Sequence, residues 1–162
     1  MKQHNRQGNS ILEVMISIVV VGVVITSVAA AIAISLQNTS RAKAKAIGTK
    51  FTQEGIEYFR AQRTLMGWET FYSTLEEGGV TPTYCLAALP YSPLGGLDQV
   101  PNRPCQLTEF VDLNNLYKRS AVVTLGTING QPTVTITVST EWPNGDRTTQ
   151  STATIQFQQS QN

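Results

Sequence analysis

The chain has 162 residues and a formal net charge of +1, from 12 basic and 11 acidic residues. This balanced charge gives no reason to expect a nucleic-acid partner, and it argues against a basic or acidic tail. The length leaves room for one compact domain of modest size beside an N-terminal leader and a membrane span. The C-terminal third is rich in threonine, serine and glutamine, which favours an exposed, β-rich domain over an enzyme with a deep pocket.

The N-terminal region joins a short polar leader to an apolar run that contains one carboxylate. Lys2 and Arg6 precede Gly8, and the apolar run covers about residues 11–36, with Glu13 near its start. A charged side chain in hydrocarbon costs about 3 kcal/mol on insertion scales, so the presence of Glu13 there needs an explanation. If the chain is cut after Gly8, the new amino terminus of a neighbouring copy can supply the positive charge.

Two simpler kinds of N-terminal segment compete with this interpretation. A secretory signal has an apolar core of about 7–15 residues followed by a small-residue cleavage site, and the run over residues 11–36 is too long for one. A plain membrane anchor needs about 20 apolar residues, which residues 14–34 supply. A plain anchor, however, gives Glu13 no role.

At these residues the sequence resembles the type IV prepilin and pseudopilin family. The resemblance implies that a prepilin peptidase cuts between Gly8 and Asn9, that the amino group of Asn9 is methylated, and that Glu13 acts in assembly. It also implies an inner-membrane assembly platform, other pilin subunits and the lipid bilayer as partners. The sequence departs from the family pattern at Asn9, where phenylalanine is usual, and at Ala30, where a proline follows the glycine matched by Gly22. Gly22 therefore marks either a segment that loses helicity in the fibre or a site of close helix–helix packing.

The resemblance implies a structural subunit of a type IV pilus or related fibre. A minor subunit is expected rather than a major one, because residues 12–16 (Leu-Glu-Val-Met-Ile) look like those of minor pilins and minor pseudopilins. The alternatives are a pseudopilin of a type II secretion system and a membrane-anchored binding domain that does not polymerise. No catalytic residues or cofactor are expected, because the lone histidine, His4, lies in the leader and leaves every serine and cysteine without a base.

After the membrane helix of residues 9–36, residues 37–66 predict an amphipathic helix that continues it, since they lack proline and favour helix. One stripe at spacings of three and four contains Ala44, Ile47, Phe51, Gly55, Tyr58 and Gln62, with Leu65 beside its end. The basic residues Arg41, Lys43, Lys45 and Lys50 could contact DNA or anionic lipid. A solvated helix face beside lipid headgroups is the simpler interpretation.

Residues 67–106 predict an ordered loop region, with a short helix over residues 68–75. They contain five of the seven prolines and both cysteines, Cys85 and Cys105. An even cysteine count in a small exported domain predicts a disulfide and places this domain outside the cytoplasm; two free thiols or a metal half-site are the alternatives. A disulfide between helix and sheet departs from the family's usual arrangement, in which the cysteines bracket a C-terminal loop.

Oxygen-bearing residues in and after this region could offer ligands to calcium: Asp98, Asp112, Asn114 and Asn115. They lack the regular spacing of a calcium loop. Turn and cap roles are therefore expected, and no metal site is assigned.

Residues 107–162 predict an antiparallel sheet. Residues 133–142 alternate, with Val134, Ile136, Val138 and Trp142 on one face. The dipeptide Asn129-Gly130 predicts a hairpin to a strand over residues 120–128, and a turn at residues 143–146 leads to a strand over residues 149–157. Residues 107–113 are a candidate fourth strand.

The sequence therefore predicts an α+β fold in which a long N-terminal helix, first transmembrane and then amphipathic, packs on a C-terminal antiparallel β-meander. The leader covers residues 1–8, and residues 37–162 form one globular domain. The expected location is the inner membrane, with a single span and the domain outside the cytoplasm. From there the chain would enter an extracellular pilus or a periplasmic pseudopilus.

Overall fold

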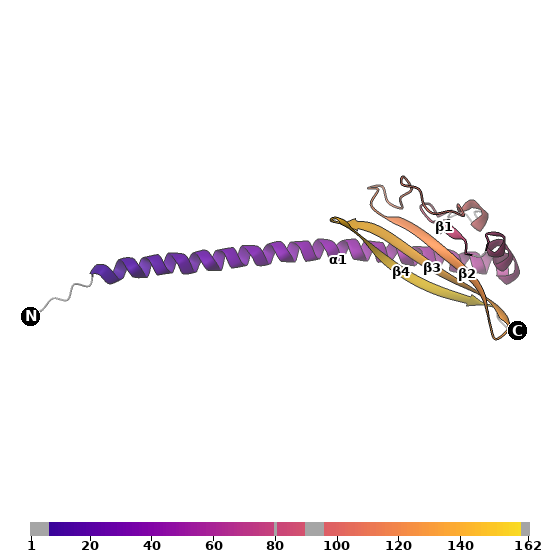
Figure 1. Cartoon of the computed structure of the whole chain (residues 1–162), viewed down its shortest axis with the longest axis horizontal. Coiled ribbons are helices and arrows are strands. Elements are labelled where there is room, and N and C mark those ends of the chain that lie inside the picture. The colour runs from indigo at the N-terminus through magenta and orange to yellow at the C-terminus, as the bar shows by residue number, and fades with distance from the viewer. Residues whose placement is uncertain (1–6, 80, 90–95, 160–162) are drawn as a thin grey trace, which may run out of the picture. The chain divides into compact units, whose positions relative to one another are not determined.

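A computed structural model describes residues 7–79, 81–89 and 96–159. It contains a long helix α1 (Gln7–Glu77), a four-stranded sheet and a single 3-10 turn η1 (Leu97–Gln99) among these residues. The chain divides into two compact units, which we call the N-terminal segment (Met1–Lys43) and the C-terminal domain (Ala44–Asn162). The α+β fold predicted from the sequence is confirmed: a long apolar N-terminal helix is followed by helix packed on an antiparallel sheet (Figure 1).

Helix α1 consists of two helical stretches that meet at Gly67. Gly67 has a φ of 75° and a ψ of 171°, which interrupts the helical backbone, and glycine adopts such a φ without steric cost. The helix resumes after Gly67 because no proline follows before Gly78 and because Phe71 and Leu75 become fully buried. The short helix predicted over residues 68–75 is therefore confirmed as the stretch of α1 after Gly67, and it continues to Glu77. The helix ends at Gly78 and Gly79, whose N–H groups donate to carbonyls three residues earlier.

The sheet is a meander in the order β1-β2-β3-β4, and every neighbouring pair is antiparallel. Strands β2 (Lys118–Ile128), β3 (Gln131–Asn144) and β4 (Arg147–Gln158) confirm the three strands predicted from alternation and turn residues. Asn129 and Gly130 both have positive φ, at 52° and 77°, as a two-residue hairpin turn that matches strand twist requires.

The fourth strand is not where the sequence suggested. Residues 107–113 form turns and bends, with Leu107 and Leu113 exposed. Strand β1 (Thr83–Cys85) pairs with β2 instead, in the register Tyr84 to Ala121. Tyr84 and Cys85 are both buried, so burial of these side chains rather than local alternation selects the edge strand.

The core lies between the second half of α1 and one face of the sheet. Its fully buried members come from α1, from the chain after β1 and from the central strands: Phe59, Phe71, Leu75, Leu86, Val123, Val134, Ile136 and Val138. The predicted stripe is confirmed at Gly55, Tyr58 and Gln62, which are buried. It is wrong at Leu65, which is 60% exposed, because the buried face of the helix continues through Phe59 and Gln62 toward Met66.

Two glycines allow α1 to lie directly on β3. A Cβ atom on Gly48 would lie 2.3 Å from the Trp142 ring, and one on Gly55 would lie 2.8 Å from Cγ1 of Val138. Between them, the buried Thr52 hydroxyl lies 2.9 Å from Oγ1 of Thr140 and 3.2 Å from the backbone oxygen of Ser151. The helix therefore contacts the sheet through the small residues Gly48 and Gly55 and through the Thr52 hydroxyl, which lies within hydrogen-bond distance of both β3 and β4.

Candidate functional site

The N-terminal segment presents an uninterrupted apolar surface. Its large side chains between Ile11 and Leu36 are more than half exposed, including Ile11, Val14, Ile18, Val21, Ile25, Val28 and Ile32. Among the described residues, α1 is the one helix long and apolar enough to cross a membrane. An exposed apolar surface of this extent marks a site of contact with lipid or protein.

Four hydroxyl groups in this segment form hydrogen bonds within the helix. The hydroxyls of Ser17, Thr26, Ser27 and Thr39 each donate to a backbone oxygen four residues earlier, at 2.6–3.0 Å. Such bonds keep these four hydroxyls paired in an environment without water.

The Glu13 carboxylate, unlike these four hydroxyls, has no partner within the described part of the helix. Its side chain is exposed, and no described residue forms an ion pair with its carboxylate. Gly8 and Asn9, the residues predicted to flank a cleavage site, lie at the start of α1. In hydrocarbon, the cost of a carboxylate at this position is offset by protonation, by water at the interface or by a cationic partner.

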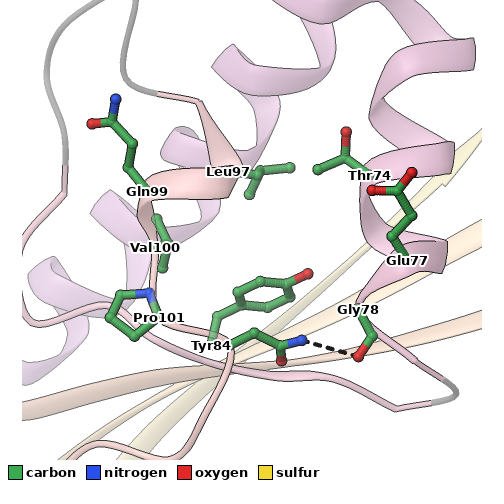
Figure 2. Close-up of a pocket in the computed structure, with 9 residues that line it drawn as sticks. Thr74, Glu77, Gly78, Tyr84, Leu97, Gln99, Val100 and Pro101 are labelled. Carbon is green, nitrogen blue, oxygen red and sulfur yellow. Dashed lines mark hydrogen bonds between the residues drawn. The ribbon is translucent and has the colours of Figure 1, made fainter.

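The C-terminal domain has a pocket of about 370 Å³ beside the end of α1 (Figure 2). Leu97, Val100 and Pro101 form an apolar wall, and the polar lining is Thr74, Glu77, Gly78, Tyr84, Gln99 and Asn102. The amide nitrogen of Asn102 donates to the Gly78 oxygen at 2.9 Å, which fixes one rim. Tyr84 is 3% exposed, and burial raises the pKa of its phenol.

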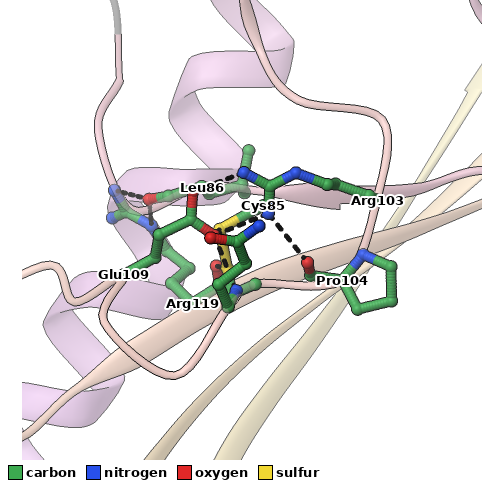
Figure 3. The surroundings of a disulfide bond; sticks show 8 residues. Cys85, Leu86, Arg103, Pro104, Glu109 and Arg119 are labelled. Carbon is green, nitrogen blue, oxygen red and sulfur yellow. Dashed lines mark hydrogen bonds and ion pairs between the residues drawn. A yellow bond between two sulfur atoms is a disulfide. The ribbon is translucent and has the colours of Figure 1, made fainter.

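Cys85 and Cys105 are joined in a disulfide, as the cysteine count predicts (Figure 3). The bond links β1 to the chain before β2 and closes a loop of sequence separation 20. Glu109 lies beside the sulfurs, so these three residues could be read as a metal site. Both sulfurs are bonded to each other and cannot act as thiolate ligands, which removes the half-site alternative.

A bidentate ion pair between Arg103 and Glu109 lies beside the disulfide. Both terminal nitrogens of Arg103 donate to the Glu109 carboxylate at 2.7 Å, and the Gln106 N–H donates to it at 2.6 Å. These bonds lower the pKa of Glu109 to about 2, and the bond from the Arg103 guanidinium has the largest effect. They also raise the pKa of Arg103. The ion pair thus joins Arg103 to Glu109 within the loop before β2, beside the disulfide, and it depends on an ionised Glu109.

Arg119 lies fully inside the domain, behind the disulfide. Its Nε and Nη2 donate to the Leu86 oxygen at 3.1 and 3.0 Å, and its Nη1 donates to the Phe51 oxygen at 2.8 Å. Nη1 also lies 3.3 Å from the Glu54 carboxylate. One buried guanidinium therefore ties β2 to α1 and to the chain after β1, an arrangement that the sequence analysis missed.

The residues weighed as calcium ligands serve a turn instead. The Asp112 carboxylate accepts backbone N–H bonds from Asn114, Leu116 and Tyr117 at 2.8–3.2 Å. Asn115 has a φ of 55°, typical of a turn. The side chain of Asp98 lies outside the described part of the structure.

Comparison of the chain with family models, with curated proteins and with solved structures found no match.

Proposed function

We propose that this chain is a membrane-anchored structural subunit, processed after Gly8 and polymerised through α1 into a type IV pilus or a related fibre. The observation that carries the proposal is the exposed apolar helix of the N-terminal segment, with the single carboxylate Glu13 unpaired among the described residues. A plain anchor gains nothing from a carboxylate in that position, whereas a trimmed amino terminus at Asn9 of a neighbouring copy would neutralise it.

The C-terminal domain supports the same proposal. It has its own core, a disulfide and a rigid helix-to-sheet contact, as a domain exposed outside the cytoplasm requires. Its sheet carries no arrangement of side chains that favours catalysis, so packing and display are its proposed roles. We place the chain as a minor subunit on the resemblance of residues 12–16 to those of minor pilins and pseudopilins.

Substitutions that remove or shorten the Glu13 carboxylate test this proposal. Two unit charges 4 Å apart attract by about 4 kcal/mol at an effective dielectric constant of about 20, so loss of the carboxylate should strongly disfavour assembly. Glu13→Ala should be cleaved and accumulate in the membrane at wild-type levels, while its incorporation into sheared fibres falls at least about tenfold. Glu13→Asp should be intermediate, because the charge remains on a shorter side chain.

Ser17→Ala is the matched control, since it changes the same region of the helix without a change in charge. It should incorporate like the wild type. Wild-type incorporation of Glu13→Ala would contradict the proposal and favour a non-polymerising anchor. Fibres found only when secretion of folded enzymes is active would instead favour the pseudopilin of a type II secretion system.

A further inference from the structure

The end of α1 in the C-terminal domain carries an electrostatic imbalance. The last turn contains Glu76 and Glu77 and no basic residue, although a helix C-terminus carries partial negative charge and is stabilised by cations. Both glutamates are exposed, and no described residue forms an ion pair with either of them. A positive charge from outside the domain would therefore be attracted to this end.

The pocket beside this end of α1 contains a tyrosine hydroxyl that has no hydrogen-bond partner among the described residues. The Tyr84 side chain is almost fully buried, and Figure 2 shows its hydroxyl pointing toward the helix end that carries Thr74 and Gly78. No hydrogen bond joins this hydroxyl to a described residue. The phenol oxygen and the Glu77 carboxylate can both accept from an ammonium group, while the wall of Leu97 and Val100 suits an alkyl chain.

A complementary charge lies at the other end of the same domain. Lys45 is exposed in the first turn of the domain and has no ion pair among the described residues, whereas Lys50 lies 3.7 Å from Glu54. Residues 45–66 alone span about 30 Å at 1.5 Å per helical residue, so Lys45 cannot reach the pocket of its own chain. Subunits that share one direction in a fibre meet through two different surfaces, one from each end.

We infer that the pocket at the end of α1, lined by Glu77 and Tyr84, receives the Lys45 side chain of a second copy of this chain. The contact is heterologous, because the pocket of one copy takes the lysine of the next, and it can therefore repeat along a fibre without closing. The inference rests on the proposed function and adds to it a specific contact between C-terminal domains. It is independent of the contact proposed at Glu13.

The first test uses fibres of the unmodified chain. Zero-length carbodiimide coupling joins an amine to a carboxylate only when the two are in contact. Peptide mass spectrometry of the covalent dimer should find Lys45 linked to Glu77. Links from Lys45 only to other carboxylates would overturn the inference.

A charge exchange gives the second test. Glu77→Lys and Lys45→Glu should each lower the fibre yield about tenfold at an unchanged membrane level, the factor expected from one charge-assisted pair. The double variant should return to within about threefold of the wild type. Asp146→Lys, which makes the same charge change on an exposed residue of the turn between β3 and β4, should leave the yield unchanged.

The outcomes separate this inference from the proposed function. If the wild type forms fibres while Glu77→Lys matches it, or if the double variant is no better than the single ones, the Lys45 contact is wrong and the proposed function stands. If the wild type is neither cleaved after Gly8 nor found in fibres, both fail.

Discussion

Replacement of Gly48 by alanine should destabilise the C-terminal domain by about 2 kcal/mol. The new Cβ would lie 2.3–2.8 Å from three atoms of the Trp142 ring, and overpacking of this kind costs about 1–3 kcal/mol. Trp142 is 4% exposed and its ring lies 5.8 Å from that of Tyr117, so it has little room to move and the cost should be near the upper limit. The gain in helix propensity from glycine to alanine offsets about 1 kcal/mol.

Thermal unfolding of the full chain in detergent, followed by near-ultraviolet circular dichroism, measures this effect. An unfolding entropy of about 2.1 cal/mol/K per residue converts 2 kcal/mol into a fall of about 8 °C in Tm for a domain of this size. Gly55→Ala should cost less, since its nearest contact is 2.8 Å from one methyl group of Val138. Ala46→Gly, at an exposed position, is the control for propensity alone and should cost about 1 kcal/mol. A Gly48→Ala domain as stable as the wild type would refute the close contact between α1 and β3.

Two further predictions concern the loop before β2. Replacement of both Cys85 and Cys105 by serine should lower the free energy of unfolding by about 3 kcal/mol, from the loop entropy that the disulfide removes; denaturant unfolding with unchanged stability would contradict this. Glu109 has a pKa lowered to about 2 in the folded chain, so its contribution to stability is present above the ordinary pKa of a glutamate and disappears as the pH falls toward 2. A Glu109→Gln variant should therefore be less stable than the wild type at pH 7, and the difference should vanish near pH 2; a constant difference across that range would show that the carboxylate charge is not the cause.

The sheet could be predicted because its signals are local. Alternation over residues 133–142 and the turn at Asn129-Gly130 need only neighbouring residues to specify a hairpin, and strands β2, β3 and β4 follow from them. Strand β1 carries no such signal. It has three residues and pairs with residues of β2 that lie 35 or more positions later in the chain, such as Ser120 with Cys85.

The packing of the helix on the sheet could be predicted, but the role of two glycines in that contact could not. Gly48 and Gly55 weaken a helix when judged by propensity alone, and only the position of β3 shows that they permit close approach. Arg119 looks like a surface residue of a strand in the sequence. Three of its hydrogen bonds go to the backbone oxygens of Phe51 and Leu86, which a sequence pattern cannot identify because any residue type offers the same group.

The candidate functional residues also include some that the sequence could identify and some that it could not. Gly8 and Glu13 could be singled out because a glycine, a basic leader and a carboxylate occur at fixed spacing in an apolar run. The pocket lined by Glu77 and Tyr84 could not, since its walls come from the end of α1, from β1 and from η1.

The intact mass of the protein in sheared fibres distinguishes a processed fibre subunit from a plain membrane anchor. The chain should begin at Asn9, with or without one added methyl group, and Cys85 and Cys105 should still be joined. Gly8→Val should leave a full-length precursor in the membrane, which controls for cleavage by unrelated proteases. A mature chain that begins at Met1, or at a site beyond the apolar run, would contradict the proposal that this is a processed fibre subunit.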